Sequence, residues 1–474
     1  MGGGLAGITA ALALADLGQA VTLVETRPRL GGLAFSFRRA GPFGELTVDN
    51  GQHVYLRCCT AYRGFLDRIG GATLAPLQRR LDVPVRDVVS GRTGRLRRTA
   101  LPVPLHLAAG LARYPHLAPA ERLAVARAAL ALRRLDPRDP ALDGQDFAGW
   151  LRRHGQSTRC VEALWDLVGV ATLNARAADV SLALAAKVFR TGLLSEPGAA
   201  DLGIPRVPLG ELHDTLARAA LRRAGVRVLL ATGARALRRA PDGWRLAVGP
   251  RRRDPGTPPA PPEFGRDPAS TDATEAGGEL VADRVVLAVP PREAHRLLPP
   301  GALADADRLL GLDTAPILNV HVVYDRPVLR GGFLAALGGP IQWVFDRTGP
   351  SGLDRLPGRG RAQYLALSQS AAHDEIGLPV DALRERYLPA LARLLPAAAG
   401  AGVRDFFVTR EPSATFAPTP GVGRLRPGPV TGSPGLSLAG AWTATGWPAT
   451  MEGAVRSGLA AAMAATRTTA KEYA

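Results

Sequence analysis

The glycine-rich start of the chain, MGGGLAGITAALALADLGQAVTLVET, narrows most what the chain can fold into. Gly2, Gly4 and Gly7 form a G-x-G-x-x-G pattern that runs directly into an apolar helix predicted over 5–17. In such a turn the first glycine allows a tight bend, the second lets the backbone approach a pyrophosphate, and the third lets the helix pack closely on a sheet. The pattern predicts a dinucleotide-binding βαβ unit. A flexible, glycine-rich terminus is the competing interpretation.

An acid at the end of the next strand supports the dinucleotide interpretation. The segment QAVTLVE predicts a short buried strand that ends at Glu25, 18 residues after Gly7. A carboxylate at that place accepts hydrogen bonds from ribose hydroxyls and repels a 2′-phosphate. The spacing therefore favours FAD or NAD over NADP.

Two further glycine turns favour FAD over NAD. Gly31 and Gly32 follow the acid closely, where a second approach of the backbone can hold an extended dinucleotide. The segment LAGAWTATGWPATMEGAVRSG near the end of the chain adds a turn that enters a helix at Met451–Gly453 and suits the polar edge of a flavin. A simple NAD dehydrogenase needs neither element.

Only Met1 stands before Gly2, where a parallel sheet needs its central strand. Without that strand its neighbours keep unpaired backbone groups, each costing about 1–3 kcal/mol against a total stability of about 5–15 kcal/mol. We therefore expect the first β-strand to be missing from the sequence as given, and the protein to begin further upstream.

The basic charge of the chain has an unusual composition. A formal net charge of +17 comes with 57 arginines but only two lysines, Lys187 and Lys471. Codon bias of a GC-rich genome explains this pattern, and attraction to an anionic membrane surface is the alternative. Aromatic residues are not interleaved with the basic ones as single-strand nucleic-acid binders require. We expect no nucleic-acid partner.

The cysteines and the apolar segments indicate where in the cell the protein is expected. Cys58, Cys59 and Cys160 include no metal-ligand spacing, so we expect no metal site and no disulfide framework. The apolar start has no basic residue before Arg27, which argues against a signal peptide. No stretch reaches about 18 uninterrupted apolar residues. We expect a cytoplasmic protein, with peripheral binding to the inner face of the membrane as an added option.

The length of 474 residues favours two or three domains. We predict an FAD-binding domain assembled from residues 1–75, 205–300 and 415–474. A substrate-binding domain is predicted from 76–204 and 301–414.

Period-two alternation predicts a hairpin with PDG at its turn in GVRVLLATGARALRRAPDGWRLAV. The proline-, glycine- and charge-rich segment 250–278 reads as a disordered insertion.

The motifs together resemble flavoproteins of the phytoene desaturase and monoamine oxidase type. Within that superfamily the chain looks like the hydroxysqualene dehydroxylases of bacterial hopanoid synthesis, also called squalene-associated FAD-dependent desaturases. The motifs that carry this resemblance are DNGQHV (49–54), VATLN (170–174), IQWVFDR (341–347), EPSATFAPTPG (411–421) and TGWPATMEGAVRSG (445–458). The resemblance implies an α/β fold, that of a flavoprotein of the two-dinucleotide-binding-domain type. Such a protein has a glutathione-reductase-like FAD domain with an inserted α+β substrate domain.

The resemblance also implies the cofactor-binding residues. They are Gly2, Gly4 and Gly7 for the pyrophosphate, Glu25 for the ribose, Gly31 and Gly32 along the cofactor, Ala234 at the adenine, Gly440 at the ribityl chain, and Met451 with Gly453 at the flavin. Two positions depart from the family. Leu33 stands where a basic residue is usual, so Arg29 or Arg38 must neutralise the pyrophosphate, and Ala441 stands where an acid is usual.

The activity that the resemblance implies is reduction of hydroxysqualene to squalene, with hydride passing from reduced flavin N5 to an allylic cation. An external electron donor is needed, because the chain has one dinucleotide fingerprint. The proton donor is sought among His53, Asp49 and Glu411, for each of which a structural role is the alternative. An oxidative carotenoid-type desaturase, an amine-oxidase-like flavoenzyme and a non-catalytic prenyl-binding protein remain as alternative functions.

Overall fold

Two pairs of parallel strands form the centre of the region that begins with the glycine turn. The computed structural model describes residues 1–250 and 277–467. Strand β1 (Thr22–Val24) pairs with β8 (Arg227–Leu229), and β12 (Val285–Leu287) pairs with β18 (Leu436–Leu438). The amino group of Met1 donates to the carbonyl of Val286, and the Gly2 N–H donates to the carbonyl of Val24, each at 2.8 Å. Residues 1 and 2 thus lie between the two strand pairs.

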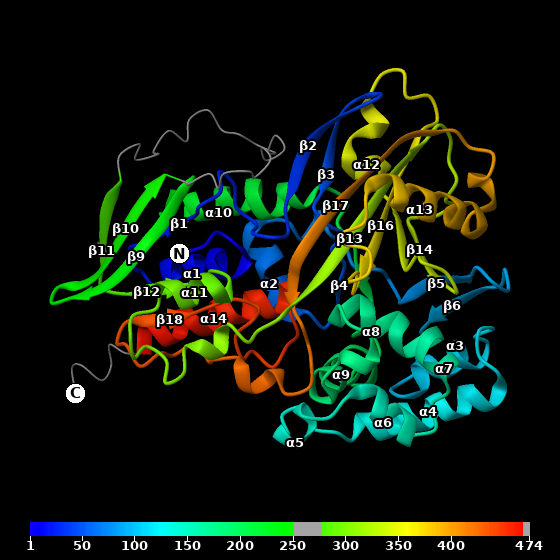
Figure 1. Ribbon diagram of the computed structural model, residues 1–474, viewed down its shortest axis with the longest axis horizontal. Helices are drawn as coiled ribbons and strands as arrows, with labels where there is room; N and C mark the ends of the chain where they lie inside the picture. Colours follow the sequence, from blue (N-terminus) through cyan, green and yellow to red (C-terminus); the bar gives the residue numbers. More distant parts are fainter. Residues whose placement is uncertain (251–276, 468–474) are drawn as a thin grey trace.

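Helices cover these strands. The predicted helix after the glycine turn is confirmed as α1 (Leu5–Asp16), which packs against the closing helix α14 (Met451–Arg467) (Figure 1). A Cβ at Gly458 would overlap the carbonyl oxygen of Ala6, so this contact between the two helices needs glycine. The other helical elements of this region are α2 (Thr60–Ile69), η1 (Ala72–Leu74), η6 (Glu211–Leu216), α10 (Ala217–Arg223), α11 (Pro291–Leu297), η7 (Asp307–Leu309) and η10 (Val422–Leu425).

A three-stranded antiparallel sheet extends from this region. It contains β9 (Thr232–Ala240), β10 (Gly243–Pro250) and β11 (Gly278–Ala282). The hairpin predicted at PDG is confirmed, since β9 and β10 pair on either side of Asp242. The insertion predicted over 250–278 lies outside the described residues except at its ends, where Pro250 and Gly278 belong to strands rather than to a loop.

A seven-stranded sheet forms the second half of the molecule, in the order β17-β13-β16-β15-β14-β5-β6. Its strands are β5 (Asp82–Asp87), β6 (Thr93–Arg97), β13 (Thr314–Tyr324), β14 (Phe333–Leu337), β15 (Trp343–Asp346), β16 (Gln363–Ser370) and β17 (Val403–Phe416). One face packs on α13 (Val380–Leu394) through buried leucines, valines and tyrosines. The short turns α12 (Thr348–Ser351), η8 (Leu353–Arg355) and η9 (Pro396–Ala398) connect these elements.

The other face of the sheet meets the hairpin of β2 (Ser36–Gly41) and β3 (Gly44–Asp49). Phe37 and Val48 of the hairpin pack in one cluster with Val323, Tyr364 and Phe407 of the sheet. The hairpin falls in the predicted range 1–75, yet it shares its apolar core with the seven-stranded sheet. The predicted domain boundaries stay a prediction.

Helices gather beside one end of the seven-stranded sheet, where Figure 1 shows them in cyan and green. They are η2 (Leu105–Leu107), α3 (Ala108–Ala112), α4 (Pro119–Arg133), α5 (Pro140–Asp143), α6 (Phe147–Arg153), α7 (Thr158–Cys160), η3 (Val161–Trp165), α8 (Asp166–Leu173), η4 (Ala177–Asp179), α9 (Leu182–Phe189) and η5 (Arg190–Leu194). The short strands β4 (Tyr55–Leu56) and β7 (Leu202–Gly203) pair with each other. None of the helices within 1–250 and 277–467 is both long and apolar enough to cross a membrane.

Candidate cofactor and active site

The glycine turn at the start of the chain is shaped for a phosphate group. A Cβ at Gly7 would overlap the carbonyl oxygen of Gly2, so the turn closes only with glycine at this position. Gly4 is the N-cap of α1, and no side chain caps this helix end. Uncapped N–H groups and the helix dipole together favour an anion.

Glu25 holds this turn from the end of β1. Its carboxylate accepts hydrogen bonds from the N–H groups of Gly3, at 2.5 Å, and Arg27, at 2.7 Å. Each carboxylate oxygen can accept more than one hydrogen bond. Glu25 can therefore keep the turn in place and still accept from a ribose hydroxyl.

The second glycine turn faces the first. Gly31 has a φ of +93°, which favours glycine. A Cβ at Gly32 would lie 3.0 Å from the Cα of Gly4, so side chains at these positions would fill the space between the turns. The structure brings Gly4 and Gly32 together as a cofactor cradle requires.

Arg29 lies inside this second turn. The residue is 3% exposed, and its guanidinium group donates to the carbonyl of Gly32 at 2.9 Å and lies 3.4 Å from the centre of the Phe35 ring. Arg38, the alternative named from the sequence, instead forms an ion pair with Glu45 on the β2–β3 hairpin. Of the two, Arg29 is the one that places its charge within the cradle.

The glycine turn before α14 is held by Arg426, which the sequence did not single out. Its guanidinium group donates to the carbonyls of Ala441, Trp442, Thr443 and Trp447. Burial lowers the pKa of Arg426 to about 10, an effect that Asp143 opposes. A cation thus organises the turn at Ala441, where the family usually carries an acid.

Hydrogen bonds to hydroxyl groups also hold the two ends of this turn. The N–H of Gly440 donates to the hydroxyl of Ser457, and the N–H of Gly453 donates to the hydroxyl of Thr450, just before Met451 begins α14.

Ala234 lies on β9, where its carbonyl accepts from Arg296 at 3.1 Å. The adenine contact of Ala234 stays a prediction.

Asp49 lies at a junction of four segments. Its carboxylate accepts from Arg347 at 2.6 Å, from the hydroxyl of Ser36 at 2.6 Å and from the N–H of Leu209 at 2.9 Å. Both carboxylate oxygens are therefore engaged with protein donors. Of the two roles considered for Asp49, these contacts favour the structural one.

His53 follows Asp49 after a short turn. Its Nδ1 lies 3.0 Å from the carbonyl of Gly51, and because a carbonyl can only accept, Nδ1 carries the proton. Burial lowers the pKa of His53, while Gly51 and Asp49 oppose that effect. A neutral ring of this tautomer presents Nε2 as an acceptor, which does not suit a proton donor.

Glu411 lies on the sheet face that carries the 49–53 turn. In the register of β13 and β17, Glu411 pairs with Ile317 and Thr409 pairs with Asn319, so these side chains share one face. The carbonyl of Asn50 accepts from both Asn319, at 3.0 Å, and Thr409, at 3.1 Å. Within the described parts of the chain the carboxylate of Glu411 forms no hydrogen bond or ion pair.

Asn319 adds a polar atom that the sequence analysis missed. Its Nδ2 donates to the Asn50 carbonyl, which fixes the orientation of the amide. Its Oδ1 is buried and finds no hydrogen-bond partner among residues 1–250 and 277–467. Buried polar atoms are usually paired, so this acceptor is a candidate contact for a hydroxyl group.

Asn174 of the VATLN motif fixes the helices to the sheet. It ends α8 with a φ of +56°, and its side chain donates to the carbonyl of Ala315 and the hydroxyl of Thr415. Its Oδ1 accepts from the N–H of Ala371 at 2.7 Å. The motif therefore joins α8 to β13, to β17 and to the residue that follows β16, rather than supplying a reactive group.

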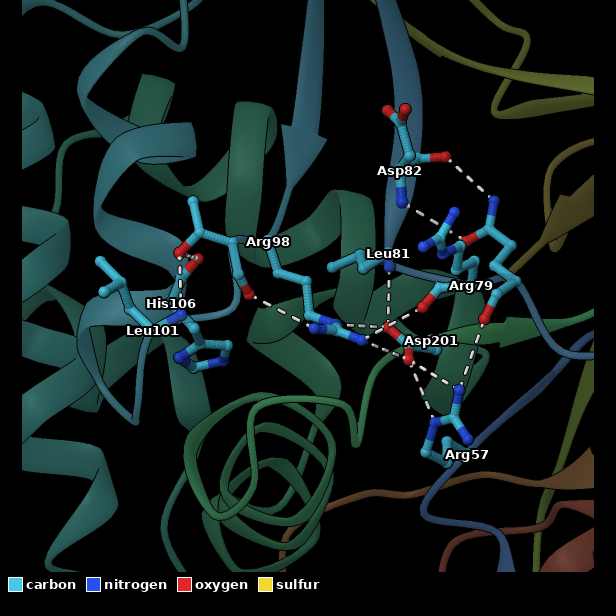
Figure 2. Close-up of polar contacts among 10 residues, drawn as sticks. Arg57, Arg79, Leu81, Asp82, Arg98, Leu101, His106 and Asp201 are labelled. Carbon is cyan, nitrogen blue, oxygen red and sulfur yellow. Dashed lines mark hydrogen bonds and ion pairs between the residues drawn. The ribbon is translucent and has the colours of Figure 1, made fainter.

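A buried carboxylate fixes β4 and the residues that follow it (Figure 2). Asp201, fully buried, accepts from Arg57 at 3.0 Å and from Arg98 at 2.6 Å, and it also accepts from the N–H of Leu81. The N–H of Cys58 donates to the carbonyl of Ala199. This network attaches the Arg57–Cys58 segment to the start of β5.

Comparison with known proteins shows which family the chain belongs to. The model of the family described as flavin-containing amine oxidoreductase matches residues 5–466. The chain is 30% identical to the hydroxysqualene dehydroxylase of Rhodopseudomonas palustris, over 98% of this chain and 96% of that protein. It is 25% identical to the enzyme of the same name from Zymomonas mobilis subsp. mobilis, over 98% and 97% of the two chains. The chain belongs to the flavin-containing amine oxidoreductase family.

The fold of this flavin-containing oxidoreductase agrees with that of solved family structures. Cyclohexylamine oxidase from Brevibacterium oxydans IH-35A superposes with a TM-score of 0.66 at 19% identity, over 99% of this chain and 98% of that one. The predictions of the α/β flavoprotein fold, of FAD and of the resemblance to hydroxysqualene dehydroxylases are confirmed. The three candidate proton donors are not tested by these comparisons.

The residues of this flavin-containing oxidoreductase fit FAD. The opposed turns at Gly4 and Gly32 carry no side chains that would stand between them, the start of α1 offers N–H groups to phosphate, and Glu25 offers lone pairs to a ribose. Bound FAD supplies two-electron redox chemistry. Among the described residues no group of three or more His, Cys, Asp or Glu side chains could hold a metal ion.

Proposed function

We propose that this flavin-dependent oxidoreductase reduces hydroxysqualene to squalene in hopanoid synthesis. The observation that carries the proposal is the full-length similarity to proteins named hydroxysqualene dehydroxylase. The opposed glycine turns support it, because the reaction needs a tightly held flavin. The amine oxidases among the solved structures share the fold only, and they support no choice of substrate.

The reaction replaces an allylic hydroxyl by hydride, which reduced FAD supplies when it is bound. The chain must protonate the leaving hydroxyl and keep water away from the allylic cation. We call the glycine turn before α14, residues 440–450, the flavin turn. Trp165 and Phe189 of the helices and Trp442 of the flavin turn belong to one continuous apolar cluster. We expect these apolar side chains to exclude water from the substrate, and the buried Oδ1 of Asn319 to accept from its hydroxyl.

An anaerobic single turnover tests the proposal. The holoenzyme is reduced with dithionite, mixed with hydroxysqualene, and the product is identified by mass spectrometry. Squalene formed together with oxidised flavin is the expected result. No conversion by a flavin-loaded protein would contradict the proposal. Formation of a more desaturated product by the oxidised enzyme would instead favour a carotenoid-type desaturase, and a purified protein without flavin absorbance would favour a prenyl-binding protein.

The reductive reaction consumes two electrons, so we also propose an external electron donor. The fingerprint at Gly2–Gly7 is the one dinucleotide motif in the sequence and serves FAD. We expect NADH or NADPH alone to reduce the bound flavin slowly, and an added flavin or iron–sulfur reductase to reduce it quickly. Rapid reduction by a pyridine nucleotide alone, followed at the flavin absorbance, would contradict this proposal.

We further propose peripheral contact with an anionic membrane, from which the apolar substrate would enter. An open depression of about 450 Å³ is lined by Gln78, Arg79, Arg80, Asp82 and Arg97. The guanidinium groups of Arg79 and Arg80 have no carboxylate partner among the described residues (Figure 2 shows Arg79 and Leu101). Further along the chain, Leu101 and Leu105 are exposed apolar side chains. Vesicles of phosphatidylglycerol should sediment the protein at low salt, and the Arg79→Glu/Arg80→Glu variant less. Absence of binding at every salt concentration would exclude this contact.

A further inference from the structure

Lys187 is the one lysine within residues 1–250 and 277–467, in a chain with 57 arginines. The two residue types differ in acidity, because arginine keeps its proton throughout the accessible pH range whereas a buried lysine can release it. Lys187 therefore differs from the surrounding arginines in that it can give up a proton.

The Lys187 side chain extends from α9 to the flavin turn. Its ammonium nitrogen lies 4.8 Å from the centre of the Trp447 ring, and the guanidinium carbon of Arg456 lies 5.1 Å from the same ring. Lys187 is half-buried, and its ammonium group forms no hydrogen bond or ion pair with another described residue. Its ammonium group thus lies near the flavin turn without a carboxylate to hold it.

The carboxylate that acts on Lys187, that of Glu452, is already paired. Glu452 accepts from Arg456 at 2.6 Å and from the N–H groups of Ala61 and Tyr62, so that it caps the start of α2. Burial, and after it the charge of Arg456, lowers the pKa of Lys187, with a smaller contribution from Arg190; Cys58 and Glu452 oppose this effect. The ammonium is therefore a stronger acid than that of a surface lysine.

The surrounding elements bring Lys187 to the predicted flavin edge. Trp447 lies in the turn that Arg426 holds, four residues before Met451. Helix α9 continues into η5, where a Cβ at Gly192 would lie 3.3 Å from Leu56 of β4. The turn, β4 with Cys58, and α9 thus meet around this ammonium group.

We propose that the Lys187 ammonium is the proton donor that lets the substrate hydroxyl leave as water. This inference rests on the proposed function. The C–O bond breaks with its electron pair on oxygen, a Lys187 N–H bond breaks, and the new O–H bond completes the water molecule. The allylic carbon then takes hydride, the reductant being the reduced flavin, and the neutral amine of Lys187 regains a proton from solvent.

The conservative variant Lys187→Arg tests the inference, because it keeps the charge and the contact with Trp447 but removes the titratable proton. Single turnovers of the reduced holoenzyme are compared for the wild type, Lys187→Arg and, as the matched control on the competing acid, Glu411→Gln. We expect Lys187→Arg to lose about 100-fold or more in rate, the range of general acid catalysis, with FAD content and substrate affinity unchanged. Glu411→Gln should lose much less rate than Lys187→Arg.

The pH profile and NMR give readouts that a structural role would not change. The wild-type rate should fall as pH rises through the pKa of Lys187, and this limb should be absent in Lys187→Arg. Lysine labelled with ¹³C at Cε gives two resonances in this chain, and Lys187→Arg identifies one of them. That resonance should titrate below the ordinary lysine value of about 10.4.

Three outcomes would overturn the inference. Lys187→Arg could react at the wild-type rate, Glu411→Gln could be the variant that loses the rate, or the Lys187 resonance could titrate at the ordinary value. A flavin-loaded wild type that converts no hydroxysqualene would instead overturn the proposed function, and the inference with it. The result for the wild type therefore distinguishes a failure of this inference from a failure of the proposed function.

Discussion

Arg347 and Asp49 form a buried ion pair, with 2.6 Å between the guanidinium and the carboxylate and side-chain exposures of 8% and 4%. They lie 298 positions apart in the sequence. The pair joins the end of the β2–β3 hairpin to the end of β15, and Arg347 also donates to the carbonyl of Pro205. The turn that carries His53 is fixed on one side by this ion pair.

Loss of one partner should therefore destabilise the fold. We expect Arg347→Met to lower the free energy of unfolding by about 3–5 kcal/mol, because it leaves a buried carboxylate without its counter-charge. Chemical denaturation followed by circular dichroism measures this. Arg38→Met, which breaks the exposed pair with Glu45, is the control and should cost under about 1 kcal/mol. An unchanged stability of Arg347→Met would contradict the structural role of Asp49.

The second glycine turn gives a prediction for FAD binding. Gly31→Ala should purify with less than a tenth of the wild-type FAD content, because alanine strains a φ of +93° and its Cβ would lie 2.8 Å from the carbonyl oxygen of Ala34. The ratio of flavin to protein absorbance measures the content. Gly64→Ala, on an open face of α2, should keep all its FAD and gain up to about 1 kcal/mol in stability. Full FAD content in Gly31→Ala would show that this turn does not hold the cofactor.

Arg426 gives a prediction for the flavin turn. Arg426→Lys keeps the charge, but an ammonium group cannot reach four carbonyls at once. We expect faster FAD release and a loss of several degrees in melting temperature, measured by flavin fluorescence and calorimetry. Arg424→Lys, next to it on the surface side of η10, should behave as the wild type. Equal FAD release from Arg426→Lys and the wild type would show that the turn forms without these hydrogen bonds.

Two buried histidines predict the acid limit of stability. Burial lowers the pKa of His321 to about 3 and that of His213 to about 4. Between these pH values and about pH 6.5, the two histidines are protonated in the unfolded chain but neutral in the folded chain. The free energy of unfolding must therefore fall as the pH decreases through this range. We expect the melting temperature to drop from pH 6.5 to pH 4. The drop should be shallower in His321→Gln and unchanged in His373→Gln, whose wild-type side chain is exposed. An equal slope for His321→Gln would contradict this cause.

The glycine turns and the strand-ending acid could be predicted because they depend on neighbouring residues. Gly31 needs a positive φ, α1 begins directly after Gly4, and Glu25 ends its strand. Each of these features lies within one short stretch of chain. The alternation that predicted the hairpin at Asp242 is local in the same way.

The roles of the candidate acids could not be predicted, because they depend on distant partners. Asp49 meets Arg347 only after the hairpin has packed against the seven-stranded sheet. The tautomer of His53 depends on the turn that places the Gly51 carbonyl beside its ring. Sequence spacing carries no information on such contacts.

By itself, the sequence determined the dinucleotide turn, the choice of FAD and the family resemblance, since backbone conformation and motif spacing are written in consecutive residues. Tertiary structure alone decided that Arg426 organises the flavin turn, that Asn319 presents a buried acceptor, and that Lys187 lies against Trp447. The physical reason is that burial, charge pairing and hydrogen-bond geometry act through space between segments that only the completed fold brings together.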